Sequence, residues 1–313
     1  MCGRQNMSRP SKQCWSRLLF RDRAAGSLIT ESYLALRLAY RFATVPPAKY
    51  CGRNISVAIP TYNNARLMHV SLLNILRDPR VSEIVVLDDG SPPREVRALK
   101  ARLKAFSGKV KLFHRDSNWG AFANKIQAVE LCANDWVLLL DADNTLLPEY
   151  LNALFSLGIW DANTIYCPAF ARPHYDFRAE LGGRVLSFDD AANMAAANKL
   201  NRPFFNDGNY FLHKDSYVAR LKPGIHAQVS AADVAFANYI WLSEGGFLAV
   251  LRTSAYLHRI HPGSSWLNNA GTAMAVLDSI LHWLALGIKW PPPDSDIRLK
   301  CVLRERCSPN RLI

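Results

Sequence analysis

The sequence has no uncharged apolar run of about eighteen residues, the length that a membrane-spanning helix needs. The nearest stretch, residues 273–287, carries Asp278 and His282 one helical turn apart. This spacing favours an amphipathic helix that packs onto the rest of the protein, with a membrane-surface helix as the alternative. Charged residues also interrupt the first apolar stretch between positions 31 and 41, so we expect no secretory signal.

Cysteine is sparse. The chain holds seven, and no two of them have the CxxC spacing that is typical of a zinc site. A chain of 313 residues can build a core without disulfides. Cys132 and Cys167 lie in apolar stretches and are expected to be small core residues. The pattern favours a reducing environment, so we expect a cytoplasmic protein and leave open a peripheral contact at the inner face of a membrane.

Positive charge is scarce outside the two ends of the chain. Residues 1–53 hold ten Lys or Arg against two acids, a net +8 of the total +12, and residues 289–313 add +3. Basic ends suit an anionic membrane surface, although solvated tails are the commoner explanation. The body between them lacks an element that interleaves aromatic and basic residues, so we expect no nucleic-acid partner.

From residue 54 onward, strand patterns alternate with helical patterns. The short connections predict an α/β fold with a mostly parallel sheet covered by helices on both faces. Residues 164–265 are less regular, and residues 27–43 predict a helix within a basic, otherwise poorly ordered N-terminal segment. We expect strands at residues 55–59, 83–87, 109–113 and 136–140. We expect one helix that ends near residue 77 and three more over 95–106, 121–133 and 147–157.

Two carboxylates, Asp141 and Asp143, follow the apolar strand expected at 136–140. Because side chains alternate in extended backbone, both would point the same way beyond the strand. Neighbouring carboxylates repel unless a cation lies between them, and hard oxygen ligands suit Mg²⁺ or Mn²⁺ carrying a phosphorylated ligand. Taken alone, the pair is better explained as a solvated turn at the end of the strand.

Polar loops follow two further strands, at residues 61–63 and 88–90. In such sheets, ligands bind in the crevice beyond the carboxyl ends of the strands. We therefore expect both loops to converge with Asp141 and Asp143 on one binding site.

Four segments, taken in order, resemble the motifs of inverting family 2 glycosyltransferases with the GT-A fold, and the resemblance covers about residues 54–265. It implies a Rossmann-like GT-A domain over residues 51–265. A basic extension of residues 1–50 with one helix would precede this domain, and a helical extension of residues 266–313 would follow it. The four motifs are Ile55–Asn64, Leu87–Ser91, Asn118–Lys125 and Asp141–Asp143.

The resemblance implies that Pro60, Thr61 and Tyr62 belong to the nucleotide site, where Tyr62 stacks on or beside the base. Asp89 would accept a hydrogen bond from a base N–H, usually of uracil or another pyrimidine. The alternative for residues 89–91 is a tight turn, which an Asp-Gly pair favours.

The resemblance also brings the backbone of Asn118 and Gly120 close to the sugar diphosphate, unless these residues only start a helix. Lys125 would neutralise a phosphate or be solvated. Asp141 would contact the ribose, the donor sugar, or a metal through water.

The implied metal is Mn²⁺ or Mg²⁺. The resemblance makes Asp143 a ligand and His261 either a third ligand or a diphosphate contact. Arg259 would be a phosphate partner, because a guanidinium pairs well with phosphate oxygens.

On the acceptor side, Gly208 and Asn209 resemble the glycine loop that frames the acceptor. Asp233 stands where the family has its catalytic base, although Ala232 replaces the acid that normally precedes it. The alternative for Asp233 is a carboxylate that the dipole favours at a helix N-terminus.

The implied function is metal-dependent, inverting transfer of a sugar from a nucleotide-sugar donor, UDP-linked, to a hydroxyl of a glycan or lipid-linked acceptor. Ala232 keeps open a degenerate GT-A module that binds nucleotide or glycan without turnover. A sugar-phosphate nucleotidyltransferase would carry a glycine-rich basic loop after the first strand, and a dinucleotide oxidoreductase would carry GxGxxG there. This chain has Pro60–Asn64 at that place, which argues against both.

Overall fold

The computed structural model describes residues 53–106, 108–225, 227, 229–292 and 311–312. The chain divides into two compact units, Met1–Pro46 and Pro47–Ile313, and every described residue belongs to the second. The helix expected at residues 27–43 and the poorly ordered segment expected before it lie outside the described residues, as does the basic extension 1–50.

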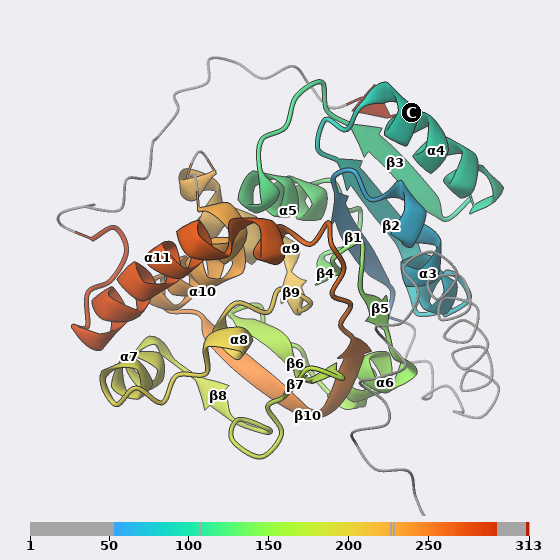
Figure 1. Cartoon of the computed structure of the whole chain (residues 1–313). Coiled ribbons are helices and arrows are strands. Elements are labelled where there is room, and N and C mark those ends of the chain that lie inside the picture. Colours follow the sequence, from blue (N-terminus) through green and yellow to red (C-terminus); the bar gives the residue numbers. More distant parts are fainter. Residues whose placement is uncertain (1–52, 107, 226, 228, 293–310, 313) are drawn as a thin grey trace, which may run out of the picture. The chain divides into compact units, whose positions relative to one another are not determined.

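The second unit is built on one mixed sheet with the strand order β11-β3-β2-β1-β4-β9-β6-β10-β5, shown in Figure 1. The pairs β1/β2, β1/β4, β2/β3 and β6/β10 are parallel. Strand β9 is antiparallel to both β4 and β6, so β6 and β10 run in the same direction as β4. The strands are β1 Ile55–Thr61, β2 Val81–Asp88, β3 Val110–His114, β4 Trp136–Leu139, β5 Thr145–Leu146, β6 Thr164–Arg172, β7 Tyr175–Asp176, β8 Val185–Leu186, β9 Phe211–His213, β10 Phe247–Leu257 and β11 Arg311–Leu312.

Helices cover both faces of this sheet, because its central strands are apolar on both sides. In β1, Ala58 belongs to one buried cluster, whereas Val57 and Ile59 belong to the other. The first cluster includes residues of α5, α10 and α11, and the second includes residues of α3, α4 and α6. The helices are α3 Ala65–Leu76, α4 Pro93–Leu103, α5 Ala121–Glu130, α6 Pro148–Ser156, α7 Phe188–Ala196, α8 Arg202–Phe205, α9 Lys214–Leu221, α10 Asp233–Ser243 and α11 Ser265–Ala285, with 3-10 turns at Lys104–Phe106, Lys222–Gly224 and Ser230–Ala232.

The strand-and-helix alternation predicted between residues 55 and 157 is confirmed, with small shifts at the element ends. One detail is wrong. Strand β4 ends at Leu139, and the following residues turn, with the N–H of Asn144 donating to the carbonyl oxygen of Asp141 at 3.0 Å. The two-residue alternation of a strand therefore does not place Asp141 and Asp143. Instead, a tight turn does.

The C-terminal helix packs onto the rest of the unit, as its amphipathic pattern indicated. Helix α11 buries Leu277, Ile280 and Leu284, which share the first core cluster with Phe236 of α10. None of the helices in the described part of the chain combines the length and apolar character needed to cross a membrane. The thiols of Cys132 and Cys167 are free and buried, as expected for core residues.

Strand direction brings the polar loops to one edge of the sheet. The carboxyl ends of β1, β2, β3, β4, β6 and β10 all face this edge, because these six strands run the same way. The loops that follow β1, β2, β4 and β10 carry Tyr62, Asp89, Asp141, Asp143 and His261. The predicted convergence of loops at one edge is therefore a property of the observed topology.

Candidate active site

The turn after β4 is fixed by its neighbours rather than exposed as a free loop. The hydroxyl of Ser71 donates to the carbonyl of Ala142 at 2.8 Å, and the N–H of Asp141 donates to Oδ1 of Asn209 at 2.9 Å. Burial raises the pKa of the Asp141 carboxyl, Lys125 opposes this rise, and the charges of Asp143 and Asp233 add to it. The turn thus holds Asp141 within electrostatic reach of three other charged groups.

Asp143 and His261 meet although they lie 118 residues apart in the sequence. His261 Nε2 lies 3.1 Å from Asp143 Oδ2, and each side chain is about a fifth exposed. The N–H of Gly263 donates to His261 Nδ1 at 3.2 Å, so Nε2 carries the proton that bonds to Asp143. The backbone N–H of Arg259 donates to Asn144 Oδ1 at 3.0 Å, which docks this segment onto the turn after β4.

This pair offers a divalent cation one oxygen donor and, once the Nε2 proton leaves, one nitrogen donor. Mg²⁺ is usually held by one or two carboxylates together with substrate phosphates and water, so a partial protein ligand set suits it. Within the described residues, no group of three or more His, Cys, Asp or Glu side chains forms a metal site. Asp143 and His261 fit an ion that a bound diphosphate helps to hold. Their roles as metal ligands stay predictions.

Lys125 is paired, so the solvated alternative for it is wrong in this structure. Its Nζ lies 2.8 Å from Asp233 Oδ2 and 3.2 Å from Asp141 Oδ1, and its side chain is only 11% exposed. Asp233 is the first residue of α10, so the prediction of a helix N-terminal carboxylate holds for its position. The same side chain faces Lys125, so a base role is compatible with that position. The neighbouring Ala232 is fully buried.

Gly208 and Asn209 lie behind the turn after β4. The Asn209 side chain is buried and donates from Nδ2 to Asp141 Oδ2 at 3.3 Å. A Cβ at position 208 would lie 2.6 Å from Val234 Cγ2 and 3.3 Å from Lys125 Nζ, so glycine permits this close approach. Asn209 therefore supports Asp141 directly. The predicted role of both residues in framing an acceptor stays a prediction.

The carboxylate of Asp89 ties the loop after β2 to residues 118–120. It accepts hydrogen bonds from the backbone N–H groups of Trp119 (3.0 Å) and Gly120 (2.9 Å) and from Arg115 (3.1 Å). Burial raises its pKa, and these three donors oppose the rise. The backbone bends at Gly90, as the turn alternative expects, with φ +74°, and a Cβ there would lie 2.5 Å from the backbone of Ser117.

The helix-start alternative at residues 118–120 is also confirmed, since Gly120 is the N-cap of α5 with φ +90°. Asn118 itself is exposed and accepts from the Gly120 N–H at 3.0 Å. Because the N–H groups of Trp119 and Gly120 already donate to Asp89, a diphosphate would have to compete for them. The contacts predicted for Asp89, Asn118 and Gly120 with the donor are untested.

The loop after β1 presents one aromatic ring to solvent. Pro60 and Thr61 are buried in the strand, and the carbonyl of Thr61 accepts from the Asp89 N–H at 2.9 Å. Tyr62 follows with 49% of its surface exposed, which leaves its ring open for stacking. The geometry is compatible with the predicted base contact, which stays a prediction.

Sequence reasoning missed a buried polar pair behind Asn209. Asp207 Oδ2 accepts from the Tyr256 hydroxyl at 3.0 Å, and its Oδ1 accepts from the N–H and the side-chain amide of Asn209, each at 3.2 Å. Burial raises the pKa of Asp207 to about 6. In the sequence, Asp207 stands beside Gly208 and Asn209. Tyr256 lies in an apolar strand, where nothing in the residue pattern indicates a polar partner.

A histidine pair after β6 and β10 was also missed. His174 Nδ1 lies 3.1 Å from His258 Nδ1. Burial and the neighbouring His174 lower the pKa of His258 to about 4. At least one of the two rings must therefore be neutral, so that its Nδ1 can accept a hydrogen bond from the other ring.

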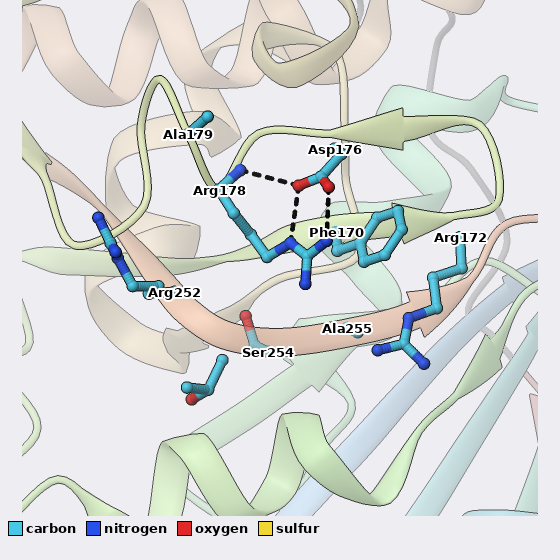
Figure 2. A pocket seen from close by; sticks show the side chains of 9 residues that line it. Phe170, Arg172, Asp176, Arg178, Ala179, Arg252, Ser254 and Ala255 are labelled. Atoms are coloured by element: carbon cyan, nitrogen blue, oxygen red, sulfur yellow. Dashed lines mark hydrogen bonds and ion pairs between the residues drawn. The ribbon is translucent and has the colours of Figure 1, made fainter.

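A separate groove of about 640 Å³ runs along β6 and β10 beside β7 (Figure 2). Acidic side chains balance the positive charge of two of its arginines. Arg178 donates two hydrogen bonds to Asp176, and Arg172 lies 3.9 Å from Glu149. The groove residues Phe170 and Ala255 are register partners, whereas the next pair along the two strands, Ala171 and Tyr256, faces the opposite side. The groove is thus on the other face of these strands from the Tyr256–Asp207 pair.

The mostly parallel sheet, the acidic turn after β4 and the polar loops at one edge fit the class of glycosyltransferases with a GT-A fold. Residues 56–215 match the model of glycosyl transferase family 2. The chain belongs to this family.

Three curated relatives share parts of the sequence. An uncharacterized glycosyltransferase, the MG060 homolog of Mycoplasma pneumoniae, is 34% identical over 107 residues, which are 33% of this chain and 36% of the relative. The succinoglycan biosynthesis protein ExoU of Rhizobium meliloti is 26% identical over 34% of this chain and 31% of its own. ExoO of the same organism is 25% identical over 70% of this chain and 64% of its own. The chain thus spans between about a third and two thirds of these relatives.

Among solved structures, the crystal structure of S. aureus TarS 1-349 in complex with UDP-GlcNAc superposes with a TM-score of 0.52. The two chains are 16% identical, and the match covers 75% of this chain and 66% of TarS 1-349. At this identity the similarity establishes the shared GT-A fold and nothing finer.

Proposed function

We propose that this glycosyltransferase transfers a sugar, with inversion, from a uridine nucleotide-sugar to a hydroxyl of a glycan or lipid-linked acceptor. The observation that carries the proposal is the set of charged groups at one sheet edge, with Asp143 paired to His261 and Lys125 placed between Asp141 and Asp233. Donor-side and acceptor-side groups are thereby held beside each other. The complex of TarS with UDP-GlcNAc supports the choice of a uridine nucleotide, and the names of ExoU and ExoO support a polysaccharide product.

The proposed chemistry assigns each group one task. Asp143 and His261 would hold Mn²⁺ or Mg²⁺, which when bound neutralises the charge that develops on the departing nucleoside diphosphate. Asp233 takes the proton of the acceptor hydroxyl as that oxygen attacks the anomeric carbon. A single base opposite the leaving group gives inversion at that carbon. Tyr62 and Arg259 would bind the nucleotide base and the diphosphate.

A thermal-shift panel of nucleotide-sugars, each with and without Mn²⁺, tests the donor half of this proposal. A ligand at 100 times its Kd stabilises a folded protein by about 2.7 kcal/mol, which a midpoint shift detects readily. We expect one nucleotide class to stabilise the protein and to require the metal. If no nucleotide shifts the midpoint, the proposal is wrong. Stabilisation without product in a hydrolysis assay would instead identify a degenerate binding module.

We further propose that the protein works at the cytoplasmic face of a membrane, in peripheral contact with anionic lipid. The support is the net +8 charge of residues 1–53, because clusters of Lys and Arg are attracted to anionic bilayers. Co-sedimentation with phosphatidylserine vesicles at low and high salt tests this. Equal retention on neutral phosphatidylcholine vesicles would contradict it.

A further inference from the structure

Lys125 reaches from the first turns of α5 to carboxylates on two other segments. Its Nζ lies 3.2 Å from Asp141 Oδ1 in the turn after β4 and 2.8 Å from Asp233 Oδ2 at the start of α10. The lysine side chain is 11% exposed and that of Asp233 is 8% exposed. This cation therefore joins the donor-side turn to the proposed base in a site that is largely shielded from water.

The packing around Lys125 fixes the distance between the two helices. The ring centroids of Phe122 in α5 and Phe236 in α10 lie 5.1 Å apart. On the other side, Gly208 allows Val234 and the lysine ammonium to approach, because a Cβ there would overlap Val234 and press on the ammonium. Lys125 and Asp233 are therefore neighbours through the arrangement of α5 and α10, and a flexible surface lysine would not be held in this way.

The charges make Lys125 necessary where it is. The carboxylates of Asp141 and Asp233 both approach one ammonium in a largely buried site, and without that cation they would repel each other. Burial lowers the pKa of Lys125, but the two carboxylates more than offset this and raise it above the ordinary value. The lysine thus stays charged.

We infer that Lys125 is a positioning residue that holds the Asp233 carboxylate aimed at the acceptor while tying it to the donor-side Asp141. This inference rests on the proposed function, in which Asp233 is the base. It differs from a phosphate contact, because Lys125 acts here through a carboxylate and not through the donor.

The groups that face Asp233 come from four places in the fold. Lys125 of α5 is the cation and Asp141 of the turn after β4 is the anion. The phenols of Tyr210, just before β9, and Tyr217 of α9 are buried and raised in pKa, hence neutral. Removing the lysine leaves the Asp233 carboxylate beside an anion and two neutral phenols, without the cation that fixes its direction. It should then turn away from Asp141 and lose that direction.

Steady-state kinetics of Lys125→Met, Lys125→Arg and Lys222→Met test the inference. Lys222 is the matched control, because it pairs at 2.7 Å on the exposed surface with Glu130 of α5, the helix that carries Lys125. For Lys125→Met we expect kcat to fall roughly 10- to 100-fold, less than the 10²- to 10⁴-fold contribution of a whole general base. We expect the donor KM to change little, because Lys125 acts through Asp233 and not on the donor.

Lys125→Arg keeps the charge but displaces it, so kcat should fall while the donor KM stays near the wild-type value. If Lys125→Met does not fold, this variant provides the test. Lys222→Met should match the wild type in both kcat and KM. A loss confined to the donor KM, with an unchanged kcat in Lys125→Met, would overturn the inference and make Lys125 a phosphate contact.

A stability measurement, which needs no catalytic turnover, separates this inference from the proposed function. Thermal midpoints of Lys125→Met, Asp233→Asn and the double variant should be non-additive, because each single change breaks the same ion pair. Additive midpoint changes would show that the two groups are not coupled and would overturn the inference. A wild-type protein that turns over no nucleotide-sugar, yet shows non-additive midpoints, would refute the proposed function alone.

Discussion

The two halves of the sheet hold their polar side chains in different ways. At the carboxyl ends of β1, β2 and β3 the partners are close in sequence, as in the bonds from Trp119 and Gly120 to Asp89, which span about 30 residues. On the β6–β10 side the partners are remote, with 118 residues between Asp143 and His261 and 68 between Asp141 and Asn209. The first half builds its loops locally. The second half completes the site by reaching across to the first.

This contrast leads to the hypothesis that nucleotide binding and catalysis depend on different halves of the sheet. If the local half binds the nucleotide and the remote half supplies the metal contact and the base, changes in the remote half should remove turnover more than they remove nucleotide affinity. The following predictions try to break that division, beginning with the largest effect.

Asp143→Ala should reduce metal-dependent turnover of the donor below detection. The substitution removes the carboxylate of the Asp143–His261 pair, so the ion loses its oxygen ligand from the protein. Turnover and the Mn²⁺-dependent midpoint shift are measured side by side, with Asp176→Ala in the remote groove as the control. Unchanged turnover would show that Asp143 is not a metal ligand.

Asp233→Asn should lower transfer by about 10²- to 10⁴-fold while nucleotide affinity stays near the wild-type value. The amide cannot accept the acceptor's proton, but it keeps the size of the carboxylate at the start of α10. Kinetics and a nucleotide titration by calorimetry measure the two quantities. A variant that loses nucleotide binding instead would point to a structural role and would break the division between the halves.

The same contrast explains what could be predicted from sequence. Strands β1 to β4 were predictable because each is an apolar run followed by a polar loop, and the parallel order then dictates that Asp89 and Asp141 meet at one edge. The partner of Lys125 could not be predicted, because Asp233 is 108 positions further along and no periodicity relates two helices packed side by side.

Two further features were hidden for other physical reasons. The turn that places Asp141 and Asp143 depends on the Ser71 hydroxyl bond to Ala142, a contact from a different helix. The Tyr256 hydroxyl bonds to Asp207 inside an apolar strand, where the residue pattern signals only burial. Long-range hydrogen bonds of this kind leave no trace in local composition.

Asp207→Asn should change how stability depends on pH between about 4 and 6. Because the folded pKa is raised from 3.8 to about 6, the folded state keeps a proton that the unfolded chain releases, so the Asp207 contribution is present below the unfolded value and is lost as pH rises to 6. The loss amounts to roughly 3 kcal/mol, at about 1.4 kcal/mol per pKa unit. The variant, which mimics the protonated form, should gain stability relative to the wild type across that window.

Urea unfolding at several pH values measures this difference. The opposite contribution of His258, whose lowered pKa of about 4 costs stability as pH falls below its usual range, is common to both proteins and cancels. The exposed Asp278, paired with Arg202, supplies the control Asp278→Asn, which should show no such trend. A wild-type-like slope in Asp207→Asn would mean that Asp207 is ionised throughout.

Gly208→Ala should have the smallest effect on stability of these substitutions, and it tests the contrast between the two halves most directly. The added methyl would overlap Val234 at 2.6 Å and press on Lys125, a case of overpacking that costs about 1–3 kcal/mol. Gly271→Ala in α11 is the matched control, because its Cβ meets nothing within 4 Å and alanine favours a helix. If the remote half sets the chemistry, Gly208→Ala should lower kcat by displacing Lys125 from Asp233 and leave nucleotide affinity intact. An equal loss of affinity would mean that this glycine supports the donor site as well, and the two halves would then act as one.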